Sequence, residues 1–361
     1  MPIPIIDSHI HLWAASHLET LAWHTHSNPL GSQHSISEYR QATASASKDP
    51  STSDATYLKG FVFLETDRIS SLAPSDWNHA LDEVSFLTRI AAGTPIEGEG
   101  HEPADRDLCL AIVPWAPVAA GPEALREYMA KVRERTQTDE IFKKVTGVRY
   151  LVQDKPSGTM LGDGFVEGLK WLGQQGLVFD LGVDARQGGL WQLEEAVEML
   201  SRVYAEQKSA PKVVINHMCK PNLRLKLAPA ELLQHPDYTT WKGHVESLSR
   251  FPATYMKLSG LFSELPPLPQ YASDEEESEL IASIVSDVAP WVDVIFYNFG
   301  PHRVMFGSDW PVCNVGGGGN QVTWGRWRKV VEALLERRGL SEEEKREVWG
   351  GVAGRVYGCS P

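Results

Sequence analysis

Cysteine is scarce in this sequence, and its cysteines lie far apart. The 361 residues include four of them, Cys109, Cys219, Cys313 and Cys359, and no two have the C-x-x-C spacing. This spacing argues against a thiolate zinc cluster and against a disulfide framework. We therefore expect four reduced thiols.

The sequence also lacks an excess of basic residues and a long apolar run. Asp and Glu number 47 against 34 Lys and Arg, which gives a net charge of −13. No basic stripe is present to neutralise phosphates, so nucleic acid is not an expected partner. No apolar run approaches the roughly 20 residues of a membrane span, and the N-terminus has no signal-peptide pattern. We expect a cytoplasmic protein without a membrane partner, and leave open whether it forms a homo-oligomer.

Short apolar runs recur along the chain, with helix-like segments between them. They cover residues 3–12, 61–65, 108–115, 145–152, 177–183, 212–218, 254–261 and 303–309. Most are continuously apolar, which is typical of parallel strands covered on both faces. Eight such strands alternating with helices predict an α/β fold, and within it a (β/α)8 TIM barrel.

We expect a single domain over residues 1–361 with long loop insertions. Three stretches, 13–57, 93–107 and 262–278, are too long and polar for plain connectors. Long loops in a compact domain are commonly lids or binding loops. Those after the first and seventh strands should lie at the carboxyl ends of the strands, where barrels of this kind place their active sites.

Two histidines, His9 and His11, stand one residue apart at the end of the first apolar run. Residues two apart in a strand point to the same face, so a strand would present both imidazoles side by side, as a metal chelate requires. The alternative is a structural role in which both rings are hydrogen-bonded. A second pair at this spacing, His24 and His26, lies in a loop segment with no strand to align it, and we interpret it as having no metal role.

Further ionisable residues end other predicted strands. Glu65 ends the second, His217 the sixth and Asp309 the eighth. Because the carboxyl ends of the strands meet at one mouth of a barrel, we expect these groups to converge with His9 and His11. Three imidazoles and a carboxylate suit zinc, with manganese or iron(II) as alternatives. The sequence therefore predicts a divalent metal.

Hydrolysis is the chemistry that such a group favours. A divalent cation lowers the pKa of its bound water and polarises a carbonyl oxygen. Asp309 could hold the attacking water, take its proton and return that proton to the leaving group. The alternative for Asp309 is a helix N-cap at the turn after the strand.

An arginine inside the fourth apolar run also needs an explanation. Arg149 must be paired or must point into the polar mouth, where its planar guanidinium would suit a carboxylate or a lactone oxygen. The alternative is a buried salt bridge with Glu65 or Asp180. Glu65 could itself bind the metal, orient an imidazole or pair with Arg149. Trp13 and Trp310 are expected to shape the substrate pocket.

The segments DSHIHLW, VINHMCKP and RVMFGSDWPV, together with GVRYLVQ and YMKLSGL, resemble the amidohydrolase superfamily. Within it they resemble the lactonase-like branch of metal-dependent TIM-barrel hydrolases, which includes sugar-acid lactonases. The resemblance extends from residue 4 to about residue 315.

This resemblance implies roles for matched positions. His9, His11 and His217 match the histidines of the site, Asp309 matches the general base, and Arg149 matches an arginine thought to contact substrate. Binuclear relatives carry a bridging lysine on the fourth strand, and here the lysines of that region precede the strand. The departure favours one metal or none, and zinc is the first choice if a metal is bound. A metal-free mechanism, in which histidines and arginines act as electrophiles, is the alternative.

The predicted function is hydrolysis of a sugar-acid 1,4-lactone, of the L-rhamnono- or L-fucono-lactone type, to the open-chain acid. Water activated by Asp309 attacks the carbonyl, and the metal, a histidine such as His217, or Arg149 stabilises the oxyanion. Asp309 and His217 are thus the predicted catalytic residues. The alternatives are a metal-dependent decarboxylase of the same superfamily and, in another class, a non-catalytic ligand-binding barrel.

Overall fold

The computed structural model of the chain describes residues 2–25, 27–46, 56–205, 210–270 and 273–359. These residues form eight β-strands, and each strand runs parallel to the neighbours with which it pairs. The strands are β1 (Ile3–Ile10), β2 (Thr56–Leu64), β3 (Cys109–Val113), β4 (Gly147–Arg149), β5 (Val178–Leu181), β6 (Val213–Ile215), β7 (Thr254–Leu258) and β8 (Val304–Phe306). Each coincides with a predicted run, although β2 begins five residues earlier than expected. The eight predicted strands are confirmed.

Hydrogen bonds close the strands into a ring. The ladders give two sheets, with the orders β1-β2-β3 and β4-β5-β6-β7-β8. At one seam the backbone N–H of Ile112 in β3 donates to the carbonyl of Lys144 before β4 at 2.7 Å. At the other seam the N–H of His11 donates to the carbonyl of Trp310 after β8 at 2.8 Å. The architecture is therefore the predicted (β/α)8 barrel.

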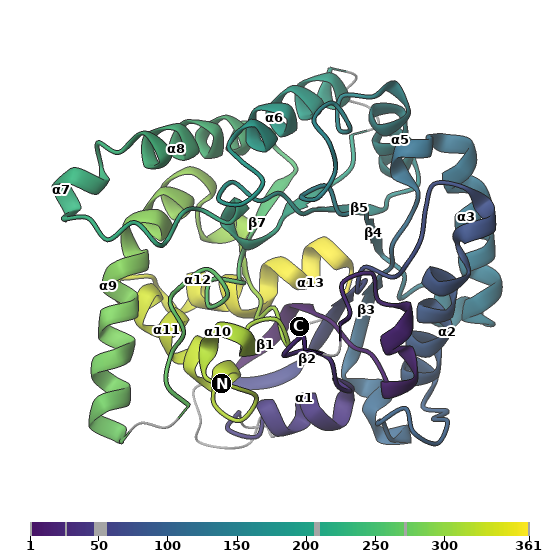
Figure 1. Ribbon diagram of the computed structural model, residues 1–361, viewed down its shortest axis with the longest axis horizontal. Helices are drawn as coiled ribbons and strands as arrows, with labels where there is room; N and C mark the ends of the chain where they lie inside the picture. Colours follow the sequence, from purple (N-terminus) through teal and green to yellow (C-terminus); the bar gives the residue numbers. More distant parts are fainter. Residues whose placement is uncertain (1, 26, 47–55, 206–209, 271–272, 360–361) are drawn as a thin grey trace.

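Helices surround the strands, and Figure 1 shows α2, α3, α5, α6, α8 and α9 along the outside of the barrel. The helices are α1 (Ile36–Ala42), α2 (Asn78–Ala92), α3 (Pro122–Thr136), α4 (Asp139–Phe142), α5 (Asp163–Gln174), α6 (Trp191–Tyr204), α7 (Pro229–Leu232), α8 (Pro236–Ser249), α9 (Asp274–Phe299), α10 (Asn314–Gly317), α11 (Thr323–Arg337), α12 (Glu342–Arg346) and α13 (Val352–Tyr357). Pro122 stands at the first position of α3, where its missing N–H costs nothing.

Side chains along each strand alternate between the helix layer and the barrel interior. On β5, Phe179 and Leu181 belong to the large apolar cluster shared with the helices. Val178 belongs to a smaller cluster that includes residues of α13. Asp180 is two residues further and shares the face of Val178, because side chains repeat every second residue. The interior therefore has an apolar floor with polar groups nearer the carboxyl ends of the strands.

Two of the expected loops contain helices. Residues 13–57 include η1 (Ala15–Thr20) and α1, and residues 47–55 lie outside the described part. The sequence predicts loop over the stretch 262–278, and this prediction is wrong for the end of the stretch, because α9 begins at Asp274. Ser273 and Glu276 form a capping box, and the acidic first turn complements the helix dipole. The stretch 93–107 ends in η3 (Pro103–Asp107).

α9 is long and apolar enough, by length and composition, to cross a membrane. It packs, however, against β7, β8, α8 and α11, and its buried residues include Trp291 and Phe296. This arrangement is that of a helix in the outer layer of a barrel.

Candidate active site

Three predicted histidines meet at the carboxyl ends of β1 and β6. His9 lies near the end of β1, His11 follows that strand, and His217 lies two residues beyond β6 in the short turn η6 (His217–Cys219). All three are buried. The Nε2 atoms of His9 and His11 are 3.2 Å apart, and the ring centroids of His9 and His217 are 4.4 Å apart. The strand alternation thus brings the pair together, as the sequence predicted.

Asp309, three residues beyond β8, points into this group. Its Oδ1 atom lies 3.5 Å from Nε2 of His9, 3.5 Å from Nε2 of His11 and 3.6 Å from Nε2 of His217. The carboxyl group is buried. One buried oxygen atom therefore faces three imidazole nitrogens.

The outward ring nitrogens have partners of their own. Nδ1 of His11 lies 3.0 Å from the carbonyl oxygens of Leu64 and Glu65, and Nδ1 of His217 lies 2.8 Å from Oγ of Ser259. A ring nitrogen that faces carbonyl oxygens must carry the proton, so Nε2 of His11 presents its lone pair to the cluster. Such outer partners orient histidines that bind metals.

His9 contacts a second buried network below the cluster. Its Nδ1 lies 3.4 Å from Nζ of Lys257 on β7, and that ammonium donates to Oδ1 of Asp180 at 2.6 Å. Tyr357 of α13 donates to the other oxygen of Asp180 at 2.7 Å. Burial lowers the pKa of Lys257 to about 8. The network joins His9 to the floor of the barrel.

Burial decides which groups of the cluster are charged. Desolvation lowers the pKa of His217 to about 3 and that of His9 well below its ordinary value. Burial alone would raise the pKa of Asp309, but the neighbouring His217 and His11 hold it below its ordinary value. At neutral pH the site thus contains the carboxylate of Asp309 beside the neutral imidazoles of His9 and His217.

The backbone around His217 adopts a conformation that L-residues rarely take. His217, Met218, Cys219 and Lys220 have φ angles of 54°, 52°, 63° and 46°. Such left-handed residues are energetically costly and tend to occur at functional sites. Gly260 makes room for the ring, because a Cβ atom at this position would lie 2.4 Å from Nδ1 of His217.

A buried carboxylate fixes the segment that carries Asp309. Asp7 accepts hydrogen bonds from the N–H of Ser308 at 2.8 Å, from its hydroxyl at 2.7 Å and from the indole of Trp324 at 2.9 Å. The N–H of Asp309 donates to the carbonyl of His9 at 2.9 Å. These bonds hold Asp309 at a φ of 62°.

Arg149 and Glu65 bind each other. Nε of Arg149 donates to Oε1 of Glu65 at 2.6 Å, and a second guanidinium nitrogen donates to the Glu65 carbonyl at 2.7 Å. The other carboxylate oxygen of Glu65 accepts the N–H of Asp67 at 2.5 Å. Of the alternatives for Arg149, the pair with Glu65 is observed, while Asp180 binds Lys257. The predicted metal-binding role of Glu65 has no support in this geometry, because both its oxygens are already engaged.

A cavity of about 300 Å³ opens above the cluster, which we call the mouth cavity. It is lined by His11, Trp13, Trp23, Asn28, Leu30, Thr66, Asp67, Arg149, Leu151, Gln153, Gly182, Asn216, His217, Lys220, Asp309 and Val312. The stretch 13–57 supplies four of these residues, Trp13, Trp23, Asn28 and Leu30. The stretch after β7, in its described residues 262–270, supplies none. Cavities of this size accommodate small-molecule ligands.

The two predicted tryptophans have different positions. Trp13 lines the mouth cavity, and its indole N–H donates to the carbonyl of Ser32 at 2.7 Å. Trp310 is not among the lining residues, so this geometry gives no support to its predicted contact with substrate. Its side chain is fully buried, packs on Tyr39 and donates to Asn320 at 2.7 Å.

Sequence reasoning missed Lys257, Asn216 and Lys220. Lys257 carried the same signal as Arg149, a charged residue inside an apolar strand. Asn216 and Lys220 flank His217 but gave no signal of their own. Of the second histidine pair, Nε2 of His24 lies 3.8 Å from Oε1 of Glu19, and His26 lies outside the described residues.

The cluster fits a metal ion. His9, His217 and Asp309 each offer a ligand atom, and these atoms all lie within 4.8 Å of one another. His11 extends the group through its contacts with His9 and Asp309. Neutral imidazoles and a carboxylate form a donor set that suits zinc. These residues can therefore hold a divalent cation.

Comparisons with known proteins show the family to which this chain belongs. The family model for the amidohydrolases matches residues 6–359. An L-rhamnono-gamma-lactonase from Scheffersomyces stipitis is 33% identical over 98% of each chain, and an L-fucono-1,5-lactonase from Burkholderia multivorans is 28% identical over 76% of each. A solved amidohydrolase from Burkholderia multivorans with bound zinc is 25% identical, covers 99% of each chain and has a TM-score of 0.67.

Proposed function

Because the chain belongs to the amidohydrolase family, we propose that it hydrolyses a sugar-acid 1,4-lactone, of the L-rhamnono- or L-fucono-lactone type, to the open-chain acid. The observation that carries this proposal is the carboxylate of Asp309, which faces three imidazole nitrogens at the base of the mouth cavity. The relative that is 33% identical over nearly the whole chain is named a lactonase, which supports the substrate class.

Asp309 is the general base of the proposed reaction. Its pKa lies below its ordinary value, so it is a carboxylate at neutral pH. It takes a proton from water as the water oxygen bonds to the lactone carbonyl carbon. When the bond from that carbon to the ring oxygen breaks, Asp309 returns the proton to the ring oxygen. The imidazoles of His9 and His217 are neutral at this pH and do not compete as proton donors.

His9, His11, His217 and Asp309 would hold a single divalent metal, with zinc as the first choice. When bound, the cation supplies a polarised carbonyl and an acidified water. The chain contributes the orientation of the ligands through the bonds of His11 to the carbonyls after β2 and of His217 to Ser259.

Arg149 supplies positive charge to the wall of the cavity. Its pKa is raised, because the attraction of Glu65 outweighs the cost of burial. The guanidinium is fixed by two hydrogen bonds to Glu65 and lines the mouth cavity. A fixed cation beside the reacting carbonyl stabilises the oxyanion that forms there.

Acid release from a panel of aldono-1,4- and 1,5-lactones, followed with a pH indicator, tests the proposal. The protein is purified without chelators, and its metal content is measured in the same preparation. We expect rapid opening of at least one sugar lactone and about one zinc per chain. Full activity without any metal would contradict the metal part of the proposal and leave the lactonase part standing.

The same preparations separate the alternatives. Release of carbon dioxide from an aromatic acid, without lactone opening, would indicate a decarboxylase. Tight lactone binding without turnover would indicate a binding barrel. Either result would refute the proposed lactonase activity.

A further inference from the structure

Asn216 is a buried amide without a partner. It follows β6 directly, and its side chain is 1% exposed. Neither its Oδ1 nor its Nδ2 has a hydrogen-bond partner among the described residues. Buried polar side chains are almost always hydrogen-bonded, so one that is not calls for an explanation. Asn216 lines the mouth cavity, and a ligand in that cavity would supply the missing partners.

The backbone holds Asn216 in place. Its N–H donates to the carbonyl of Leu181 in β5 at 3.0 Å, and its carbonyl accepts the N–H of Cys219 at 2.9 Å. These bonds fix the residue between two strands and the turn that carries His217. The amide is therefore positioned by the same turn as an imidazole of the cluster.

The polar neighbours of Asn216 in the cavity are already partnered. Lys220 donates to the side chain of Gln153 at 2.9 Å and lies 3.7 Å from Asp184. Arg149 is bound to Glu65. Among the described residues that line the mouth cavity, only Asn216 has buried side-chain atoms without a partner.

We propose that Asn216 determines specificity by binding a ring hydroxyl of the lactone, an inference that rests on the proposed lactonase function. An amide offers an acceptor oxygen and a donor nitrogen, and a hydroxyl needs both. Because Asn216 is adjacent to His217, the hydroxyl it binds is one near the reacting carbonyl. A lactone without this hydroxyl leaves the amide unpaired and is rejected for that reason.

The test compares two substrates in two variants. The substrates are a hydroxylated aldono-1,4-lactone and the matching lactone that lacks the hydroxyl next to the carbonyl. In Asn216→Leu, which has a similar volume, kcat/KM for the hydroxylated lactone should fall about a hundredfold, while kcat/KM for the deoxy lactone stays within about threefold. Asn216→Ala carries the same test if the leucine variant does not fold. The preference for the hydroxyl should collapse in either variant.

Asn28 provides a matched control. It is an asparagine of the same cavity, but its Oδ1 accepts the N–H of Leu30 at 2.9 Å and its Nδ2 donates to the carbonyl of Trp23 at 3.4 Å. Asn28→Leu should change kcat/KM for both lactones by the same factor, so the ratio of the two kcat/KM values should stay as in the wild type.

The outcomes separate this inference from the proposed function. One outcome is that the wild type opens lactones while the Asn216 variants keep the wild-type ratio of kcat/KM for the hydroxylated and the deoxy lactone. In that case the role of Asn216 is overturned and the lactonase function stands. If the wild type opens no lactone, both are overturned. A selective loss on the hydroxylated lactone supports both.

Discussion

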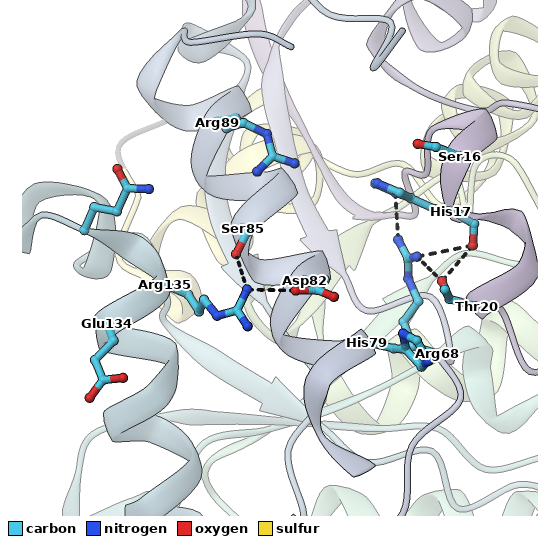
Figure 2. A pocket seen from close by; sticks show the side chains of 11 residues that line it. Ser16, His17, Thr20, Arg68, His79, Asp82, Ser85, Arg89, Glu134 and Arg135 are labelled. Atoms are coloured by element: carbon cyan, nitrogen blue, oxygen red, sulfur yellow. Dashed lines mark hydrogen bonds and ion pairs between the residues drawn. The ribbon is translucent and has the colours of Figure 1, made fainter. Parts of the chain in front are cut away.

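The mouth cavity and a larger groove on the side of the barrel differ in how their charged groups are partnered. The groove, of about 530 Å³, lies between η1, α2 and α3, and we call it the arginine groove. Figure 2 shows Arg135 beside Asp82 and Ser85, with its Nη1 at 2.7 Å and 3.1 Å from them. Arg68 likewise reaches Thr20 at 2.5 Å and His17 at 3.1 Å.

The comparison teaches that a large polar cavity is not by itself a site. In the arginine groove each cation has a nearby partner, and Arg89 is bound to Glu99 in the same way. The mouth cavity is smaller, yet its imidazoles, those of His11 and His217, converge on the carboxylate of Asp309, and one of its amides has no partner. Groups that converge without satisfying one another are the ones that a ligand or a metal can use.

The largest expected difference between the two regions is in catalysis. Asp309→Asn should lower kcat for lactone opening at least a thousandfold, because the amide cannot take a proton from water. Asp82→Asn makes the same chemical change in the arginine groove and should leave kcat within about twofold. Initial rates with a pH indicator, on proteins with wild-type circular dichroism, give the comparison. Near-normal turnover in Asp309→Asn would refute its role as the base.

The next difference is in stability. Arg149→Met leaves the carboxylate of Glu65 buried and unpaired, and should lower the free energy of unfolding by about 3 kcal/mol. Arg135→Met breaks a pair with the exposed Asp82 and should cost less than about 1 kcal/mol. Urea unfolding of both variants measures the two costs. Equal costs would mean that the Arg149 pair is no better isolated from water than the surface pair.

Metal binding should distinguish the regions in the same protein. Free zinc at a hundred times its dissociation constant should stabilise the wild type by about 2.7 kcal/mol, because it binds the folded chain. His217→Ala should lose most of this stabilisation, whereas His17→Ala, in the arginine groove, should keep it. Thermal unfolding of metal-free protein with and without zinc measures the effect. An equal response in both variants would place the zinc elsewhere.

Much of the mouth cavity was predictable from sequence, because parallel strands in a barrel end at the same rim. Knowing that His9, His217 and Asp309 end three such strands was enough to predict that they meet. Their distances depend on details that strand periodicity does not determine. The left-handed turn at residues 217–220 and the carboxylate of Asp7 set those distances, and both are tertiary features.

Other residues could not be predicted for identifiable reasons. Trp310 is adjacent to Asp309, but the backbone turns at the left-handed Asp309, and the Trp310 side chain packs in the core against Tyr39. Glu65 had three acceptable partners, and the choice of Arg149 depends on the spacing of β2 and β4 across the barrel. Asn216 became notable only through the lack of a partner, which no sequence pattern reveals.

The smallest expected difference concerns pH, and it has opposite signs in the two regions. Burial, reinforced by Glu65, raises the pKa of Asp67 in the mouth cavity to about 7. Between about pH 4 and 7 the folded chain thus binds a proton at Asp67 that the unfolded chain has lost. Stability from this group therefore falls as pH rises through that window. The free energy of unfolding of Asp67→Asn, relative to that of the wild type, should therefore rise by about 2 kcal/mol between pH 4 and pH 8. This figure is reduced because the side chain is partly exposed to solvent.

His17 in the arginine groove should respond in the other direction. Burial, with Arg68 nearby, lowers its pKa to about 4, so between pH 4 and 6.5 the unfolded chain binds the additional proton. Stability from His17 therefore falls as pH decreases through that window. The free energy of unfolding of His17→Gln, relative to that of the wild type, should rise by about 1 kcal/mol when the pH is lowered from 7 to 4. Urea unfolding at several pH values measures both differences. Slopes of the same sign would show that the two regions are not separate electrostatic environments, since an acid and a base held neutral by burial must oppose each other.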